Sequence, residues 1–174
     1  MARKRISRDD MFIQIVRVVA QRSTCLRSQV GALIVKDGRI ISMGYNGPVS
    51  GIPECKEIPY FEELVTDPNY NDRPVSQVIH ELEEDPLLCE GPGCTRSLHA
   101  ETNAIAFAAR AGVSVEGCTL YCSMSPCINC AKVIVNSGIR EVKFLKKYRN
   151  EDGIKLLKSA DIAVVDLGGT EDGN

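Results

Sequence analysis

Short strand-like runs alternate with helix-like stretches over residues 98–165, and this alternation limits the folds open to the chain. The predicted strands are Thr119–Ser123, Glu141–Leu145 and Ile162–Val165. Strands that alternate with helices are joined by right-handed crossovers and pair in parallel. This half of the chain therefore predicts a parallel sheet with helices packed on its faces.

The helices before and between these strands carry their own start and stop signals. Gly112 and Gly138 each follow a helix-like stretch, where a glycine commonly ends a helix. The Ser-Pro pair at 125–126 has the form of a helix start. The predicted helices are His99–Ala111, Ser125–Ser137 and Glu151–Ser159.

The N-terminal part adds one helix and one hairpin. Ser7 precedes a run with apolar residues at helical spacing, which predicts an amphipathic helix over residues 8–21. Asp37-Gly38 lies between two β-rich runs, Val30–Lys36 and Arg39–Gly44, and is a strong signal for a two-residue hairpin turn. The expected fold is α/β: a three-layer α/β/α sandwich around a five-stranded mixed sheet.

Residues 48–97 break this regularity. They hold most of the prolines and a cluster of acids, and only Val75–Glu84 has the pattern of a short helix. A structureless loop of this length is uncommon in a compact domain, so we expect a cross-link to hold it. We interpret residues 1–174 as a single domain with an irregular insertion at about 48–97, and Gly168–Asn174 as a frayed tail.

Charge and hydropathy narrow the class of protein. The net charge is −2 with scattered lysines and arginines, whereas polyanion-binding proteins usually carry a basic face. No apolar run approaches the roughly 20 residues of a membrane helix, and no signal-peptide core follows the basic N-terminus. We therefore expect no nucleic-acid or membrane partner and a cytoplasmic location, in the host cytoplasm if the chain is viral.

Eight cysteines are many for a chain of this size. In a small secreted protein they would indicate a disulfide framework. Without a secretion signal, and with Cys127 and Cys130 spaced Cys-x-x-Cys at a predicted helix start, metal ligation is the favoured interpretation.

His99, Cys127 and Cys130 are the predicted ligands of a catalytic zinc. His99 begins one helix and the two cysteines lie in the first turn of another, so their side chains can meet at one edge of the sheet. Three protein ligands leave the fourth tetrahedral position open, as catalytic zinc requires. Glu101 is then placed to move protons, as general acid–base catalysis requires. The alternative is a structural zinc with an incidental glutamate.

The combination of His99-x-Glu101 with Pro126-Cys127-x-x-Cys130 is the signature of zinc deaminases. From about residue 10 to 166 the chain resembles the deoxycytidylate (dCMP) deaminase family, which has the cytidine deaminase-like fold. The resemblance is carried also by Thr24-Cys-Leu-Arg-Ser-Gln-Val-Gly-Ala-Leu-Ile-Val and Gly44-Tyr-Asn-Gly-Pro. It implies a hydrolase that converts dCMP to dUMP and ammonia.

The same resemblance implies roles for residues outside the zinc signature. Asn46 is expected at the deoxyribose 3′-hydroxyl, and Arg27 and Tyr148 near the 5′-phosphate, since a guanidinium matches phosphate oxygens. Ser125 completes the expected substrate-binding set. The alternatives are a solvated arginine and a tyrosine at a strand end.

Part of this family has a second, structural zinc site, and the resemblance implies one here. Its expected ligands are Cys25, Cys55, Cys89 and Cys94, a closed set of four thiolates that would tie down the insertion. Four reduced cysteines are the alternative. Cys118 and Cys122 are expected in the core, and His80 at the surface.

Members of the family are often hexamers that dCTP activates and dTTP inhibits. We therefore expect a homohexamer with an effector site that includes a face of the helix after His99. The expected effector residues are Gly44, Tyr45, Gly47, Asn103, Phe107 and Arg110. A core phenylalanine and a solvated arginine are the alternative for Phe107 and Arg110.

Three other functions stay open at this point. The enzyme could act on dCTP as well as dCMP. A nucleic-acid-editing or nucleic-acid-binding module of the same fold is disfavoured by the missing basic or aromatic stripe. A regulatory homologue without chemistry is disfavoured because Glu101 and all three ligands are intact.

Overall fold

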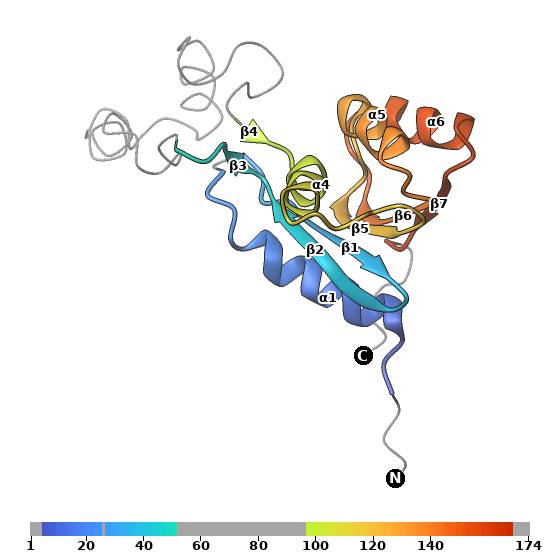
Figure 1. The fold of residues 1–174 in the computed structure, drawn as a ribbon, viewed down its shortest axis with the longest axis horizontal. Helices are drawn as coiled ribbons and strands as arrows, with labels where there is room; N and C mark the ends of the chain where they lie inside the picture. The colour runs from blue at the N-terminus through green and yellow to red at the C-terminus, as the bar shows by residue number, and fades with distance from the viewer. Residues whose placement is uncertain (1–4, 26, 52–96, 169–174) are drawn as a thin grey trace, which may run out of the picture. The chain divides into compact units, whose positions relative to one another are not determined.

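The computed structural model describes residues 5–25, 27–51 and 97–168 (Figure 1). The chain forms two compact units. One unit comprises Met1–Ser23, Gln29–Asn46 and His99–Asn174, and the other comprises Thr24–Ser28 and Gly47–Leu98. Because most of the expected insertion at 48–97, with Val75–Glu84, lies outside the described residues, the single-domain interpretation stays a prediction.

The first unit is built on a five-stranded sheet with the order β2-β1-β5-β6-β7. The strands are β1 (Gly31–Lys36), β2 (Arg39–Tyr45), β5 (Thr119–Met124), β6 (Glu141–Lys146) and β7 (Ala163–Asp166). β1 is antiparallel to both β2 and β5, whereas β6 is parallel to β5 and β7 is parallel to β6. The prediction of a mixed sheet with a parallel C-terminal half is confirmed.

The turn between β1 and β2 has the backbone that the Asp-Gly pair predicts. Asp37 and Gly38 both have positive φ, 50° and 74°, which is the conformation of a type I′ hairpin turn. The strand register shifts between Ile34 and Val35, so one extra residue of β2 is accommodated as a bulge.

Helices cover both faces of the sheet (Figure 1). The helices are α1 (Arg8–Ala20), α4 (Ala100–Arg110), α5 (Ile128–Asn136) and α6 (Asp152–Ser159). Leu33 and Val35 of β1 pack in one buried cluster with residues of α1. Ala32 and Ile34, which point the other way, pack in a second cluster with residues of α4, α5 and α6. The three-layer α/β/α sandwich is therefore confirmed.

α4 lies unusually close to the edge strand β2. A Cβ atom at Gly44 would overlap the carbonyl oxygen of Ala100 and lie 2.5 Å from the nitrogen of Ala104. The hydroxyl of Ser42 also donates a hydrogen bond to the Ala104 carbonyl at 2.7 Å. These contacts fix the first turn of α4, where the expected site residues begin.

Two details differ from the predictions. α5 begins at Ile128, not at Ser125, because the chain still follows β5 at Ser125, whose N–H donates a hydrogen bond to the Lys146 carbonyl.

The second unit contains an antiparallel pair that was not predicted, β3 (Gly47–Pro48) and β4 (Ser97–Leu98). Strands of two residues carry too little pattern to be recognised in sequence.

None of the helices in the described segments combines the length and the hydropathy needed to cross a membrane.

Candidate metal centre and active site

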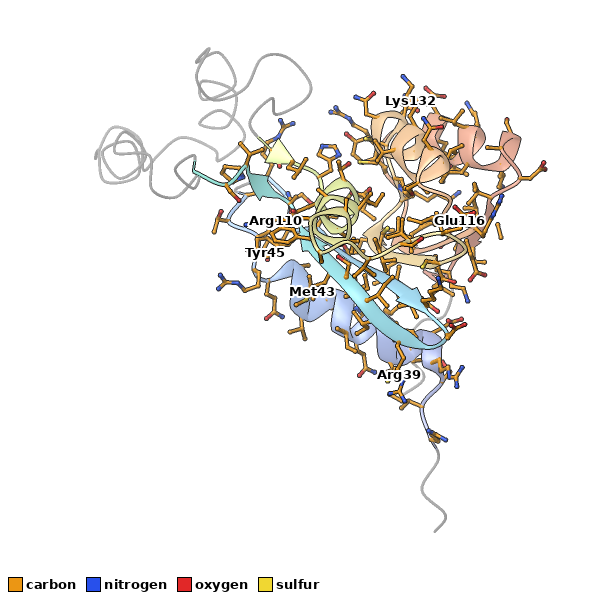
Figure 2. All side chains as sticks on the ribbon, in the orientation of Figure 1. Arg39, Met43, Tyr45, Arg110, Glu116 and Lys132 are labelled. Atoms are coloured by element: carbon orange, nitrogen blue, oxygen red, sulfur yellow. The ribbon has the colours of Figure 1, made fainter. Side chains whose placement is uncertain are left out.

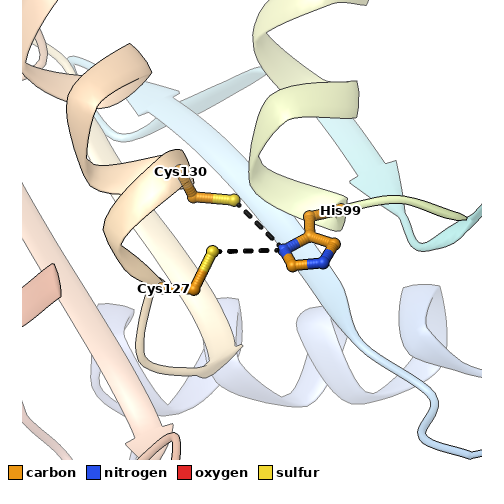
Figure 3. A group of neighbouring side chains, drawn as sticks. All are labelled: His99, Cys127 and Cys130. Atoms are coloured by element: carbon orange, nitrogen blue, oxygen red, sulfur yellow. Dashed lines mark hydrogen bonds between the residues drawn. The ribbon is translucent and has the colours of Figure 1, made fainter. Parts of the chain in front are cut away.

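Two of the three predicted zinc ligands occupy helix N-cap positions. His99 is the N-cap of α4 and Cys127 is the N-cap of α5, and both have extended backbone with no side-chain capping bond. An N-cap side chain ordinarily turns back to the first N–H groups of its helix. Here both side chains turn toward each other instead (Figure 3), and Cys130 joins them from the first turn of α5.

The distances between the three ligand atoms fit a zinc ion. His99 Nδ1 lies 3.4 Å from Cys127 Sγ and 3.4 Å from Cys130 Sγ (Figure 3). A tetrahedral zinc with Zn–N of about 2.1 Å and Zn–S of about 2.3 Å separates its nitrogen and sulfur ligands by about 3.6 Å. One imidazole and two thiols are also a donor set that zinc prefers. His99, Cys127 and Cys130 therefore form a zinc-binding site with one tetrahedral position left for another ligand.

Hydrogen bonds connect the three ligand side chains. A hydrogen bond from Cys130, with a further one from His99, lowers the pKa of Cys127 to about 3. The pKa of Cys130 is raised because this sulfur keeps the proton that it donates to Cys127, and because it is buried. Hydrogen bonding to Cys127 raises the pKa of His99. The trio thus holds protons that a metal would displace on binding.

Glu101 lies in the first turn of α4, two residues after the histidine ligand, and is only 4% exposed. Burial raises the pKa of its carboxyl group. A carboxyl whose pKa lies closer to neutral takes up and releases a proton more readily, which suits a general acid–base role.

Three further predicted residues lie at the same edge of the sheet. Ser125 is buried directly after β5, and its Oγ accepts a hydrogen bond from the Tyr148 N–H at 2.8 Å. Because β5 and β6 are parallel, their carboxyl ends meet, which brings Tyr148 beside the segment that bears Cys127. Asn46 is buried at the end of β2, where its Oδ1 accepts a hydrogen bond from the Val30 N–H at 2.8 Å.

The structure buries a few polar side chains, which sequence patterns do not reveal. Among the described residues, the buried polar or charged ones are Ser23, Asn46, Glu101 and Ser125. Three of these four are predicted site residues. Burying a polar group costs free energy unless it is bonded, and Asn46 and Ser125 each accept a hydrogen bond from a backbone N–H; their roles in substrate binding stay predictions.

The structure places the expected effector residues of β2 and α4 in different surroundings. Gly44 lies against α4, so close packing explains its lack of a side chain. The Tyr45 side chain points to the opposite face of the sheet, where the Arg22 guanidinium carbon lies 6.0 Å from its ring centre. Asn103 of α4 donates a hydrogen bond to the backbone carbonyl of Tyr45 at 2.8 Å. Phe107 and Arg110 are exposed on α4. Phe107 is therefore not a core residue.

Figure 2 labels several exposed side chains of the first unit. Met43 and Tyr45 project from β2, and Arg110 projects from the end of α4.

The other predicted residues lie in the second unit, in the core, or outside the described residues. Cys25, Arg27 and Gly47 belong to the second unit, and Cys55, Cys89 and Cys94 lie outside the described residues, as does His80. The second zinc site and the roles of Arg27 and Gly47 stay predictions. Cys118 and Cys122 are buried in the core, as expected.

Two residues that touch the metal ligands were not predicted. Thr102 Oγ1 lies 3.5 Å from Cys130 Sγ. A Cβ atom at Gly153, in the first turn of α6, would overlap the Pro126 carbonyl oxygen and lie 2.8 Å from the Cys127 carbonyl carbon. Both contacts join residues far apart in sequence, so no local pattern could reveal them.

The sequence matches a known family over most of its length. Residues 6–146 match the family model described as "Cytidine and deoxycytidylate deaminase zinc-binding region". This stretch contains Glu101 and all three zinc ligands.

Similar proteins include three phage deaminases, two compared by sequence and one by structure. The deoxycytidylate deaminase of Enterobacteria phage T2 is 36% identical over 173 residues, which cover 89% of this chain and 89% of that protein. The deoxycytidylate deaminase of Mycobacterium phage D29 is 34% identical, covering 80% of this chain and 94% of that one. The crystal structure of dCMP deaminase from the cyanophage S-TIM5, in complex with dCMP and dUMP, is 27% identical with a TM-score of 0.70, covering 95% of this chain and 100% of that one.

Proposed function

The chain belongs to the cytidine and deoxycytidylate deaminase family, and we propose that it is a dCMP deaminase, a hydrolase that converts dCMP and water to dUMP and ammonia. The observation that carries this proposal is the arrangement of His99, Cys127 and Cys130 around one point, with the buried Glu101 in the same helical turn as the histidine. The choice of dCMP as substrate is supported by the similar phage enzymes.

The reaction requires one proton carrier and one activated water. A zinc ion held by His99, Cys127 and Cys130 would make a water molecule more acidic and so supply a nucleophile near neutral pH. Glu101 takes a proton from the attacking water and delivers it to the ring nitrogen N3 of cytosine. The new C4–O bond gives a tetrahedral intermediate, from which the C4–N bond breaks.

Glu101 then acts a second time. Its carboxylate takes the proton from the C4 hydroxyl of the intermediate and delivers it to the departing amine, so that ammonia leaves and the C4 carbonyl of uracil forms. Because burial keeps the pKa of Glu101 raised, one group can serve as base and then as acid. Proton transfer of this kind contributes about 10²–10⁴-fold in rate.

The remaining predicted contacts belong to the same proposal. Asn46, Ser125 and Tyr148 lie at the carboxyl edge of the sheet, which supports a place for the sugar and phosphate beside the metal. Arg27 is proposed as a further phosphate ligand from the family resemblance alone. A structural zinc on Cys25, Cys55, Cys89 and Cys94 and a cytoplasmic location are proposed on the same ground.

Regulation by nucleotides is the finer part of the proposal. We propose a homohexamer that dCTP activates and dTTP inhibits, with Asn103, Phe107 and Arg110 in the effector site. The exposure of Phe107, which is 50%, and of Arg110 supports this, since an exposed ring and guanidinium can contact a nucleotide.

The decisive variant is Glu101→Gln, which keeps the size of the side chain and removes its proton-carrying ability. The variant should bind zinc as the wild type does, because Glu101 is not among the ligands, and should lose turnover of dCMP by about 10²–10⁴-fold. Zinc content and ammonia release, measured on the same preparations, test the expected zinc binding and the expected loss of turnover. Full activity in this variant would exclude the mechanism.

A substrate panel separates this function from its alternatives. Ammonia release should be fastest with dCMP and weak with cytidine and adenosine. Equal rates with dCTP would favour the broader deaminase. Retention on DNA or RNA at moderate salt, without activity on any free nucleotide, would favour a nucleic-acid module.

A further inference from the structure

Thr102 makes a polar contact with the metal centre without being a ligand. Its Oγ1 lies 3.5 Å from the Sγ of Cys130. Thr102 sits in the first turn of α4 and Cys130 in the first turn of α5, so the contact joins the two helices that supply the ligands. Cys130 is 2% exposed, which leaves little room for water to take the place of the hydroxyl.

The direction of this hydrogen bond is set by the metal. A cysteine ligand binds as the thiolate, which has no proton to donate. A threonine hydroxyl has one donor hydrogen. With a metal bound, Thr102 can therefore only donate and Cys130 can only accept.

Such a hydrogen bond reduces the electron density that the thiolate sulfur donates to the metal. Two thiolates formally cancel the charge of a divalent zinc and so weaken its effect on a fourth ligand. A hydrogen bond to a thiolate is charge-assisted and draws electron density from the sulfur. Groups in this position commonly change metal affinity or activity by about 10–100-fold.

We propose that Thr102 is a positioning residue that donates a hydrogen bond from its hydroxyl to the Cys130 thiolate, orients this sulfur and limits its electron donation to the metal. The predicted effect of Thr102 on metal binding requires only that His99, Cys127 and Cys130 bind zinc. Its predicted effect on the turnover of dCMP also requires the proposed deaminase function.

The test compares Thr102→Val, which replaces the hydroxyl by a methyl group, with Thr102→Ser, which keeps it. In the cobalt(II)-substituted protein, loss of the hydrogen bond raises the energy of the sulfur lone pairs. The sulfur-to-cobalt charge-transfer band should therefore move to longer wavelength in Thr102→Val and stay in place in Thr102→Ser. Zinc affinity, measured by competition with a chromophoric chelator, should fall about 10-fold in Thr102→Val, because losing the bond that orients the sulfur outweighs its stronger electron donation, and should recover in Thr102→Ser.

Thr119→Val is a matched control. Thr119 is also a partly buried threonine whose hydroxyl has one acceptor, Glu141 Oε2 at 2.9 Å, but it lies at the start of β5, away from the metal ligands. This variant should leave both the band and the zinc affinity unchanged. If Thr102→Val does not fold, Thr102→Ala removes the same hydroxyl and should give the same shift.

The rate gives a separate readout. Turnover of dCMP should fall about 10-fold in Thr102→Val and recover in Thr102→Ser. If the wild type releases no ammonia from any nucleotide, the proposed function fails while the cobalt and zinc measurements still decide this inference. A band and affinity equal to wild type in Thr102→Val, or an equal shift in Thr102→Ser, would overturn it.

Discussion

At the residue scale, Asp9 links α1 to the sheet through its charge. Its carboxylate accepts hydrogen bonds from the Tyr121 hydroxyl and, at 3.0 and 3.1 Å, from the Lys143 ammonium group. Burial opposes ionisation, but the bonds from Tyr121 and Lys143 outweigh it and hold the pKa of Asp9 below its ordinary value of 3.8. The ionised form therefore stabilises the fold above that value, and this contribution is lost as the pH falls through the lowered pKa.

We expect Asp9→Asn to lower the free energy of unfolding at pH 7 by about 1 kcal/mol, a value discounted for screening because the side chain is 38% exposed. The difference from wild type should shrink toward zero as the pH falls below about 4. Urea unfolding at pH 7, 5, 4 and 3 measures it, and any loss of zinc in acid affects both proteins alike. Asp161→Asn, in an exposed turn, is the control. A difference that stays constant down to pH 3 would show that the charge of Asp9 is not the cause.

At the element scale, α6 holds the segment that carries a metal ligand. The backbone of Gly153 touches Pro126 and Cys127 so closely that a methyl group has no space there. We expect Gly153→Ala to push this segment away from His99 and to lower zinc affinity about 10-fold, since overpacking costs about 1–3 kcal/mol and 1.4 kcal/mol corresponds to a factor of 10. Competition with a chromophoric chelator measures the affinity.

Gly31→Ala is the matched control for this contact. A Cβ atom at Gly31 would lie 2.5 Å from the Val16 carbonyl oxygen and 2.8 Å from the Ala20 nitrogen, so the clash is similar but lies between β1 and α1. This variant should lose stability and keep its zinc affinity. Equal losses of zinc affinity in both variants would mean that general destabilisation, and not the α6 contact, controls the site.

At the scale of the whole molecule, the proposed regulation requires communication between an effector site and the active site. We expect dCTP to raise and dTTP to lower the turnover of dCMP, and to change how sigmoidally the rate depends on dCMP concentration. Phe107→Ala should weaken both responses because the exposed ring is part of the proposed effector site. Steady-state rates at fixed dCMP with increasing effector measure this.

Val133→Ala provides the comparison for regulation. Val133 is an exposed apolar residue on α5, outside the proposed effector face, and its truncation should leave both responses intact. Turnover that neither nucleotide alters in the wild type would remove the regulatory proposal, while leaving the deaminase proposal to its own test.

The sequence by itself determined those parts of the protein that depend on neighbouring residues. The order of strands and helices follows from local hydrophobic periodicity, and the turn at Asp37-Gly38 follows from the positive φ angles that this pair tolerates. The Cys127-x-x-Cys130 spacing is also local. Combined with His99-x-Glu101, this spacing is enough to identify the three ligands and to predict Glu101 as the proton carrier.

Only the tertiary structure decided which distant groups complete that site. The start of α5 depends on how Ser125 bonds to Lys146, the space for Gly153 depends on the path of Pro126, and the Thr102–Cys130 contact spans 28 positions in the chain. Contacts of this kind leave no periodic or local pattern, because they arise only when separate helices pack on one sheet. They place further groups against the ligands, whereas the sequence motif sets the chemical identity of the ligands themselves.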